Sequence, residues 1–260
     1  MSTMRNIGLI TTSRDLLILR AIAITRVLEV EQVMAIGGFR SVRRANRRLL
    51  KLVQAGLLKR WFVGTASGGQ KAIYGLSPQG ATVIGETRQG VISWKEDSLI
   101  TSSQFLAHQR AVNAIFIQVR FQPQTVSGFS CELWRTFREP LSPSVPLMPD
   151  GYFELIQSGA VYPMFLEVDL GTESSRVWKR KVELYLKLAL GGEFERMFHE
   201  KRFRVLVALH SERRMQVLRK TIAKRTEKLF WLSTQDALNR EGLYSPIWLR
   251  PTGDERKPLL

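Results

Sequence analysis

Apolar residues recur every three or four positions in the first part of the chain, a spacing that predicts short amphipathic helices. The apolar positions fall at Leu16, Leu19 and Ala23 in a first helix and at Val30, Val33 and Met34 in a second. Ser13 is suited to cap the first helix, and Gly37-Gly38 ends the second. Ser41 is suited to cap a third helix that runs to about residue 55 and ends at Gly56. Two helices, a glycine turn and a third helix indicate a helix-turn-helix.

The segment after the third helix has the pattern of a β-hairpin. Residues 57–63 are predicted as a strand, residues 64–69 as a glycine-rich tip, and residues 72–76 as the returning strand. Ser77-Pro78 then starts another helix, because proline is favoured in the first helical turn. A hairpin that follows a helix-turn-helix is a wing, so residues 1–84 are predicted to form a winged helix-turn-helix domain.

The third helix divides into two faces when its residues are placed on a helical wheel. One face is apolar and carries Val42, Ala45, Leu49, Leu52 and Val53. The other face is cationic and carries Arg40, Arg43, Arg44, Arg47, Arg48 and Lys51. A solvated surface usually mixes acids with bases, whereas this face has no acid, which favours contact with the DNA major groove. The remaining predicted DNA contacts are Ser41 and Asn46 beside this face and Lys59, Arg60 and Lys71 on the hairpin.

The overall charge supports a polyanionic partner. The 260 residues include 39 Lys and Arg against 23 Asp and Glu, which gives a formal net charge of +16. Residues 13–76 alone hold 12 Lys and Arg against 3 Asp and Glu. Binding of such a chain to double-stranded DNA is favoured by counterion release. A second basic stretch, residues 201–228, is predicted either to extend the DNA footprint or to be solvated helix surface.

Other sequence features limit the cellular location and the kinds of site that the protein can have. Every apolar run is shorter than the roughly 20 residues that a membrane span needs, and no secretory signal is apparent. The single cysteine, Cys131, has no internal disulfide partner, and no Cys and His cluster has zinc spacing. The chain is therefore predicted to be a cytoplasmic protein without a membrane partner.

The second half of the chain alternates between predicted helices and strands. Helices are expected at 103–119, 174–190 and 211–228, and strands at 128–134, 151–155, 163–170, 203–209, 229–232 and 247–249. This order implies a mixed sheet covered by helices on both sides, so the whole chain is predicted as a two-domain α+β or α/β protein. The predicted divisions are a linker at 85–100, a second domain at 101–250, and a tail at 251–260 that is loose or binds a partner.

Three carboxylates in this second domain suggest a metal-binding site. Asp150 begins one predicted strand, and Glu167 and Asp169 share one face of the next because side chains alternate along a strand. Such carboxylates would repel one another unless a divalent cation, most plausibly Mg²⁺, lay between them. On the following helix, Lys181 falls within the apolar arc of the wheel and is therefore expected to have an anionic partner.

These residues resemble the PD-(D/E)xK nuclease core, also called the restriction-endonuclease-like core. In that core an aspartate and a Glu-x-Lys pair bind metal and activate water, and Asp150 and Glu167 match the two acids. The chain departs from the pattern at Asp169, which occupies the lysine position. The resemblance implies either that Lys181 supplies the missing cation in an active site or that Lys181 neutralises Glu167 or Asp169 in an inactive scaffold.

The order of several short motifs resembles the replication-relaxation family of bacterial plasmid and integrative-element proteins. The motifs are Tyr74-Gly75-Leu76-Ser77-Pro78-Gln79-Gly80, His108 with Asn113, Pro149-Asp150, Phe165-Leu166-Glu167-Val168-Asp169-Leu170-Gly171-Thr172-Glu173, Lys181 with Tyr185, and Ile247-Trp248. The resemblance implies a role in replication, relaxation or mobilisation of plasmid or mobile-element DNA.

Three functions remain open at this stage. The first is a DNA-binding initiator or accessory factor whose second domain is a scaffold for replication or mobilisation proteins. The second is a Mg²⁺-dependent endonuclease or nickase that uses Asp150, Glu167 and Asp169 as metal ligands and Lys181 to position water. The third is a transcriptional regulator whose second domain dimerises or senses a ligand. Paired half-sites would make a homodimer the natural form of such a protein, although no heptad zipper is present.

Overall fold

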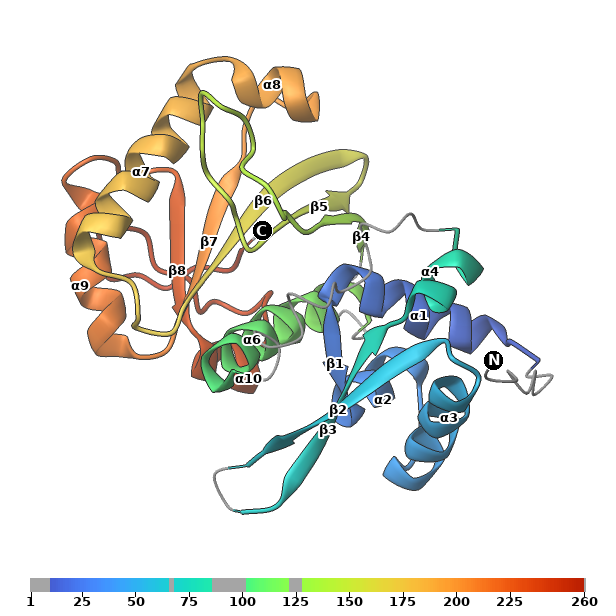
Figure 1. The fold of residues 1–260 in the computed structure, drawn as a ribbon. Coiled ribbons are helices and arrows are strands. Elements are labelled where there is room, and N and C mark those ends of the chain that lie inside the picture. The colour runs from blue at the N-terminus through green and yellow to red at the C-terminus, as the bar shows by residue number, and fades with distance from the viewer. Residues whose placement is uncertain (1–9, 66–67, 86–101, 122–127, 260) are drawn as a thin grey trace. The chain divides into compact units, whose positions relative to one another are not determined.

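A computed structural model describes residues 10–65, 68–85, 102–121 and 128–259. The chain divides into two compact units, Met1–Ile117 and Gln118–Leu260, and each unit is described by itself (Figure 1). The first unit is mixed α and β with a three-stranded sheet, and the second is built on a five-stranded mixed sheet. The predicted linker at 85–100 lies almost wholly outside the described residues, as do residues 66–67 at the tip of the predicted hairpin.

The first unit follows the predicted order of helices and hairpin. Its elements are α1 (Ser13–Thr25), β1 (Val27–Glu29), α2 (Val30–Gly37), α3 (Val42–Gln54), β2 (Leu58–Gly64), β3 (Gln70–Leu76), α4 (Pro78–Val83) and most of α6 (Ser103–Arg120). The strands are antiparallel in the order β1-β3-β2. The short strand β1 was not predicted, because three residues are too few to show an alternating pattern.

Most of the predicted helix caps and glycine stops lie at the same residues in the structure. Ser41 caps α3 by accepting a hydrogen bond from the Arg44 amide, and Ser77 caps α4 in the same way through the Gly80 amide. Gly38 ends α2 in the left-handed region, with φ of 62°. The prediction for α1 was wrong by one residue. Thr12 rather than Ser13 is the cap, because Thr12 and Asp15 exchange hydrogen bonds in a capping box.

The first part of α6 is anchored to β1 within the first unit. The Asn113 side-chain amide is buried and donates to the Val27 carbonyl oxygen at 2.7 Å. Gln109 in turn donates to the Asn113 side-chain oxygen at 2.9 Å. Asn113 therefore packs and hydrogen-bonds in the interior.

The second unit confirms the predicted mixed sheet. Its strands are β4 (Phe129–Arg135), β5 (Gly151–Gln157), β6 (Ala160–Asp169), β7 (Arg204–Leu209) and β8 (Phe230–Thr234), and they lie in sequence order. The first three strands pair antiparallel, and β6, β7 and β8 pair parallel. The helices are α7 (Ser175–Leu190), α8 (Glu193–Phe198), α9 (Glu212–Ala223) and α10 (Gln235–Glu241).

A large apolar core lies between this sheet and the pair α7 and α9 (Figure 1). Alternate residues of β7, namely Val205, Val207 and Leu209, point into it. The intervening Leu206 and Ala208 are also inaccessible to solvent, so both faces of β7 are covered. Strands buried on both faces have few polar positions, which is why β7 appears in the sequence as a continuous apolar run.

The end of the chain differs from the prediction. Residues 247–249 form single bridges rather than a strand, with Leu249 opposite Leu232 and Trp248 opposite Lys257. The tail after Arg250 is anchored rather than loose, since Leu259 is fully buried and the Gly253 carbonyl accepts a hydrogen bond from Arg219, while residues 252–258 are exposed. Within the part of the chain that the structure describes, no helix has the length and apolar character to cross a membrane.

Candidate functional site

The helix α3 carries the predicted cationic surface. Ala45, Leu49 and Leu52 are completely buried, whereas the opposite face is open to solvent. The predicted DNA contacts that are exposed here are Arg40 just before the helix and Arg43, Arg44, Asn46, Arg47 and Lys51 on it. None of these five cations forms an ion pair with a carboxylate in the described parts of the chain. Their charge therefore faces solvent without a compensating acid, and we call Arg40, Arg43, Arg44, Arg47 and Lys51 the α3 cationic face.

Arg48 was predicted to belong to this face, but its side chain forms an ion pair with Asp15 within the protein. Its Nε donates to Asp15 Oδ1 at 2.7 Å, its Nη2 pairs with Asp15 Oδ2, and the same Nη2 donates to the Ile10 carbonyl at 3.0 Å. Burial opposes the charge of Asp15, but hydrogen bonds from Arg48 and Thr12 prevail and lower the pKa of the carboxyl. Arg48 thus joins α3 to the start of α1.

Of the other predicted DNA contacts, some are engaged within the protein and some are exposed. Lys71 on β3 pairs with Glu29 at 2.8 Å and with Glu31 at 3.0 Å, so its charge is already neutralised within the first unit. Lys59 is half-buried on β2, whereas Arg60 is exposed and lies over the Phe62 ring. The Ser41 hydroxyl caps α3. Val42, which the helical wheel assigned to the core, is 49% exposed because it lies in the first turn.

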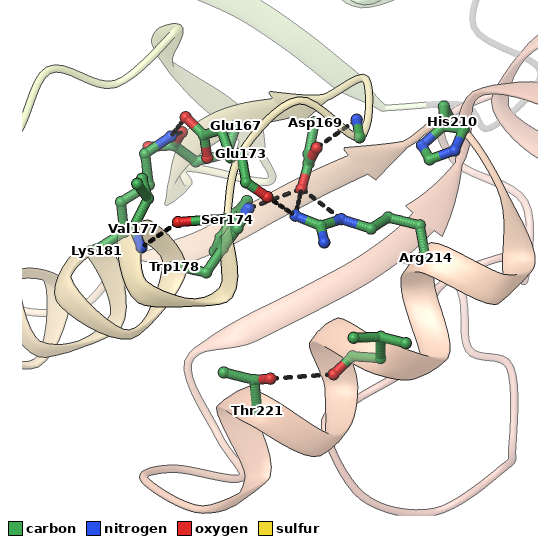
Figure 2. A network of polar contacts seen from close by, with 12 residues as sticks. Glu167, Asp169, Glu173, Ser174, Val177, Trp178, Lys181, His210, Arg214 and Thr221 are labelled. Atoms are coloured by element: carbon green, nitrogen blue, oxygen red, sulfur yellow. Dashed lines mark hydrogen bonds and ion pairs between the residues drawn. The ribbon is translucent and has the colours of Figure 1, made fainter.

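The second unit brings the two predicted acids of β6 together on one face of the sheet. Glu167 and Asp169 both point toward α7, and both are buried (Figure 2). Asp150 lies just before β5, and its Oδ2 accepts a hydrogen bond from the Val168 amide at 2.7 Å. The face that the two β6 acids share was therefore predicted correctly from strand alternation.

Lys181 pairs with Glu167, one of the two acids that the sequence offered as its partner. Its Nζ lies 2.8 Å from Glu167 Oε2 and 2.7 Å from Glu173 Oε1, and it also lies over the Trp178 ring. The Tyr185 hydroxyl donates to the other Glu167 oxygen at 2.6 Å. Burial raises the pKa of Glu167 to about 7, although the charge of Lys181 opposes this change. For Lys181, the attraction of the two glutamates outweighs burial and raises its pKa.

Asp169 has a separate set of partners that the sequence did not identify. Its Oδ2 accepts hydrogen bonds from Trp178 Nε1 at 2.7 Å and from Arg214 Nε and Nη2 at 2.9 and 2.7 Å (Figure 2). Its Oδ1 accepts from the Gly171 amide at 2.6 Å. Arg214 Nη2 also donates to the Glu173 carbonyl oxygen, which joins α9 to the loop before α7. We call Glu167, Asp169, Glu173, Trp178, Lys181, Tyr185 and Arg214 the buried acidic cluster.

The arrangement of this cluster does not fit a Mg²⁺ ion. Among the described residues, no group of three or more His, Cys, Asp or Glu side chains is arranged to hold a metal. An ion at Asp169 would have to displace the Arg214 guanidinium and the Trp178 indole, and an ion at Glu167 would have to displace Lys181. We therefore derive no catalytic step through a metal at these positions.

The raised pKa of Glu167 predicts a pH-dependent stability. An unfolded glutamate releases its proton near the ordinary pKa of 4.5, whereas folded Glu167 keeps it to about pH 7. Between these values the unfolded state binds fewer protons, so the free energy of unfolding falls as pH rises. In urea titrations we expect wild type to lose about 2 kcal/mol relative to Glu167→Gln between about pH 5 and about pH 7. A difference between the two proteins that stays constant with pH would contradict this prediction.

Comparison with known proteins identifies the family. No curated protein and no solved structure matches the chain. Residues 19–225 match the family described as Replication-relaxation, which confirms the resemblance inferred from the sequence motifs. The matched range contains both the α3 cationic face and the buried acidic cluster. The protein is thus a member of the replication-relaxation family.

Proposed function

We propose that the protein binds duplex DNA of a plasmid or other mobile element through α3 and acts there in replication or relaxation of that DNA. The observation that carries the proposal is the α3 cationic face, which is exposed, free of acids and opposite the buried residues Ala45, Leu49 and Leu52. A helix of this kind fits the major groove, where arginines reach both phosphates and base edges. Family membership supports the replication or relaxation role.

The elements around α3 support a winged helix-turn-helix as the DNA-binding unit. The helices α1, α2 and α3 precede the β2–β3 hairpin in the order that this fold has, and β1 adds a third strand beside β3. The described end of the hairpin is exposed and contains Gly64, Gly68 and Gly69. A short glycine-rich tip lets the backbone approach phosphate closely, as a wing requires.

The buried acidic cluster supports a scaffold rather than a nuclease as the role of the second unit. Each of its two β6 acids already has a protein cation as partner, Lys181 for Glu167 and Arg214 for Asp169. We expect supercoiled plasmid to remain intact when it is incubated with the protein and Mg²⁺ or Mn²⁺. Metal-dependent nicking that is lost in both Asp150→Ala and Glu167→Ala would overturn this assignment and favour the enzyme.

The direct test of DNA binding is fluorescence anisotropy with a labelled duplex taken from the DNA that flanks the coding sequence. We expect saturable binding whose affinity falls linearly with the logarithm of salt concentration, because phosphate contacts release counterions. The matched variant carries alanine at the exposed positions Arg43, Arg44 and Arg47 and is expected to show a smaller salt slope. Absence of binding at low salt, or an unchanged slope in the variant, would contradict the proposal.

Two adjacent arginines give a further prediction that separates binding from folding. Arg47→Ala is expected to weaken DNA binding about five- to hundredfold without changing the melting temperature, because Arg47 is exposed on the α3 cationic face. Arg48→Ala is expected to lower the free energy of unfolding by about 2–3 kcal/mol, because it leaves the buried Asp15 carboxylate without its cation. Anisotropy and urea unfolding of both variants check this, and equal effects of the two substitutions on stability would refute the assignment.

A further inference from the structure

A cavity of about 740 Å³ opens in the second unit at the beginning of the parallel strands. Its wall includes Met164 of β6 and Arg204 at the start of β7, which lie opposite each other in the sheet. Asp169 pairs with Leu209 at the other end of the same two strands. The cavity is therefore separate from the buried acidic cluster and lies at the opposite end of the strands.

The cavity is strongly cationic. Its lining contains five basic residues and no Asp or Glu, as far as the described residues define it; the five are Lys201, Arg202, Arg204, Lys228 and Arg250. Three of them lie just before and at the start of β7, Lys228 precedes β8, and Arg250 follows the Leu249 bridge, so they come from three separate segments. Concentrating five positive charges around one hollow is unfavourable unless an anion enters it.

Two of these arginines are held in place by aromatic rings rather than by acids. The Arg204 guanidinium lies 4.8 Å from the centre of the Trp231 ring and 5.9 Å from that of Tyr162, and Arg250 lies 4.7 Å from Trp231. Among the described residues, their hydrogen bonds go to main-chain oxygens, of Leu259 for Arg204 and of Glu227 and Lys228 for Arg250. These contacts fix the guanidinium groups but do not neutralise them.

The cavity also has donors without acceptors. Trp231 lines it and is only 7% exposed, and its buried Nε1 has no hydrogen-bond partner within the described chain. The same holds for the buried Nε of Arg250. A buried donor without an acceptor costs free energy, and both of these donors belong to residues that line the cavity.

We propose that this cavity binds a mononucleotide, whose phosphates contact Lys201, Arg202 and Lys228. The apolar part of the wall, formed by Leu186, Phe203 and Leu229, provides a surface for the base. The volume lies within the roughly 300–1,000 Å³ that is common for small-molecule sites. A bare phosphate would use the cations but would leave this apolar wall in contact with water, which is why we choose a nucleotide.

Isothermal titration calorimetry of the full chain with ATP tests the proposal. We expect saturable binding, and the charge-reversed double variant Lys201→Glu/Arg202→Glu should bind at least about tenfold more weakly, because each position loses a charge-assisted contact. The matched control is Lys179→Glu/Arg180→Glu, which reverses two exposed cations of α7 outside the cavity and should bind like wild type.

The possible results distinguish a mononucleotide from a simple polyphosphate and from a single-stranded nucleic acid. Pyrophosphate that binds as tightly as ATP would mean that the base is not recognised and would overturn the nucleotide assignment. Absence of ATP binding by a correctly folded wild type, or equal losses in the cavity variant and the α7 control, would overturn the site itself. A single-stranded oligonucleotide that binds in the cavity while ATP fails to compete would also overturn it. A variant with glutamate at Arg43 and Arg47 should bind ATP normally, so this test is independent of DNA binding by α3.

Discussion

Arg43→Glu/Arg47→Glu is expected to weaken duplex binding at least about hundredfold while the protein remains folded. Both side chains are exposed on the α3 cationic face, and neither forms an ion pair with a described acid, so their replacement removes no internal contact. Each reversal removes one attraction to phosphate or a base edge and adds a repulsion from the DNA. Fluorescence anisotropy at fixed ionic strength measures the affinity, and circular dichroism verifies the fold.

The α7 double variant Lys179→Glu/Arg180→Glu serves as the charge-matched control for this experiment. It changes the net charge by the same amount, so it accounts for the general attraction between a basic protein and DNA. We expect a loss of only a few-fold in the control. If both double variants lose the same affinity, net charge rather than α3 determines binding, and the proposed interface is wrong.

Arg214→Leu is expected to lower the free energy of unfolding of the second unit by about 3–5 kcal/mol. The Asp169 side chain is completely buried, and Arg214 is its only cationic partner among the described residues. Leucine would leave this carboxylate with the Trp178 indole and the Gly171 amide but without a compensating charge. Urea unfolding followed by tryptophan fluorescence and circular dichroism measures the change.

The neighbouring Arg213 provides the control, because it is exposed and forms no ion pair with a carboxylate in the described ranges. Arg213→Leu should change stability by less than about 0.5 kcal/mol. A second variant, Asp169→Asn/Arg214→Leu, removes both charges and should recover part of the lost stability. An Arg214→Leu protein as stable as wild type would show that Asp169 does not depend on this ion pair.

The sequence predicted most of the elements because their signals are local. Serine caps and glycine stops mark the ends of α2, α3 and α4. The alternation of strand side chains was enough to put Glu167 and Asp169 on the same face. A lysine within an apolar helical arc predicted a buried anionic partner, and Lys181 pairs with Glu167. Short elements such as β1, α8 and α10 escaped prediction because they contain too few residues to establish a period.

The sequence by itself determined that Ala45, Leu49 and Leu52 of α3 face inward, which acids share a face of β6 and to which family the chain belongs. Only the tertiary structure decided which charges are neutralised within the protein. Arg47 and Arg48 are indistinguishable as neighbours in a basic helix, yet Arg48 meets Asp15 from another helix. Arg214 meets Asp169 across the sheet, and the five cations of the cavity converge from separate segments. Helical and strand periods specify the direction of a side chain along its own element, whereas its partner depends on which distant segments the fold brings within hydrogen-bonding distance.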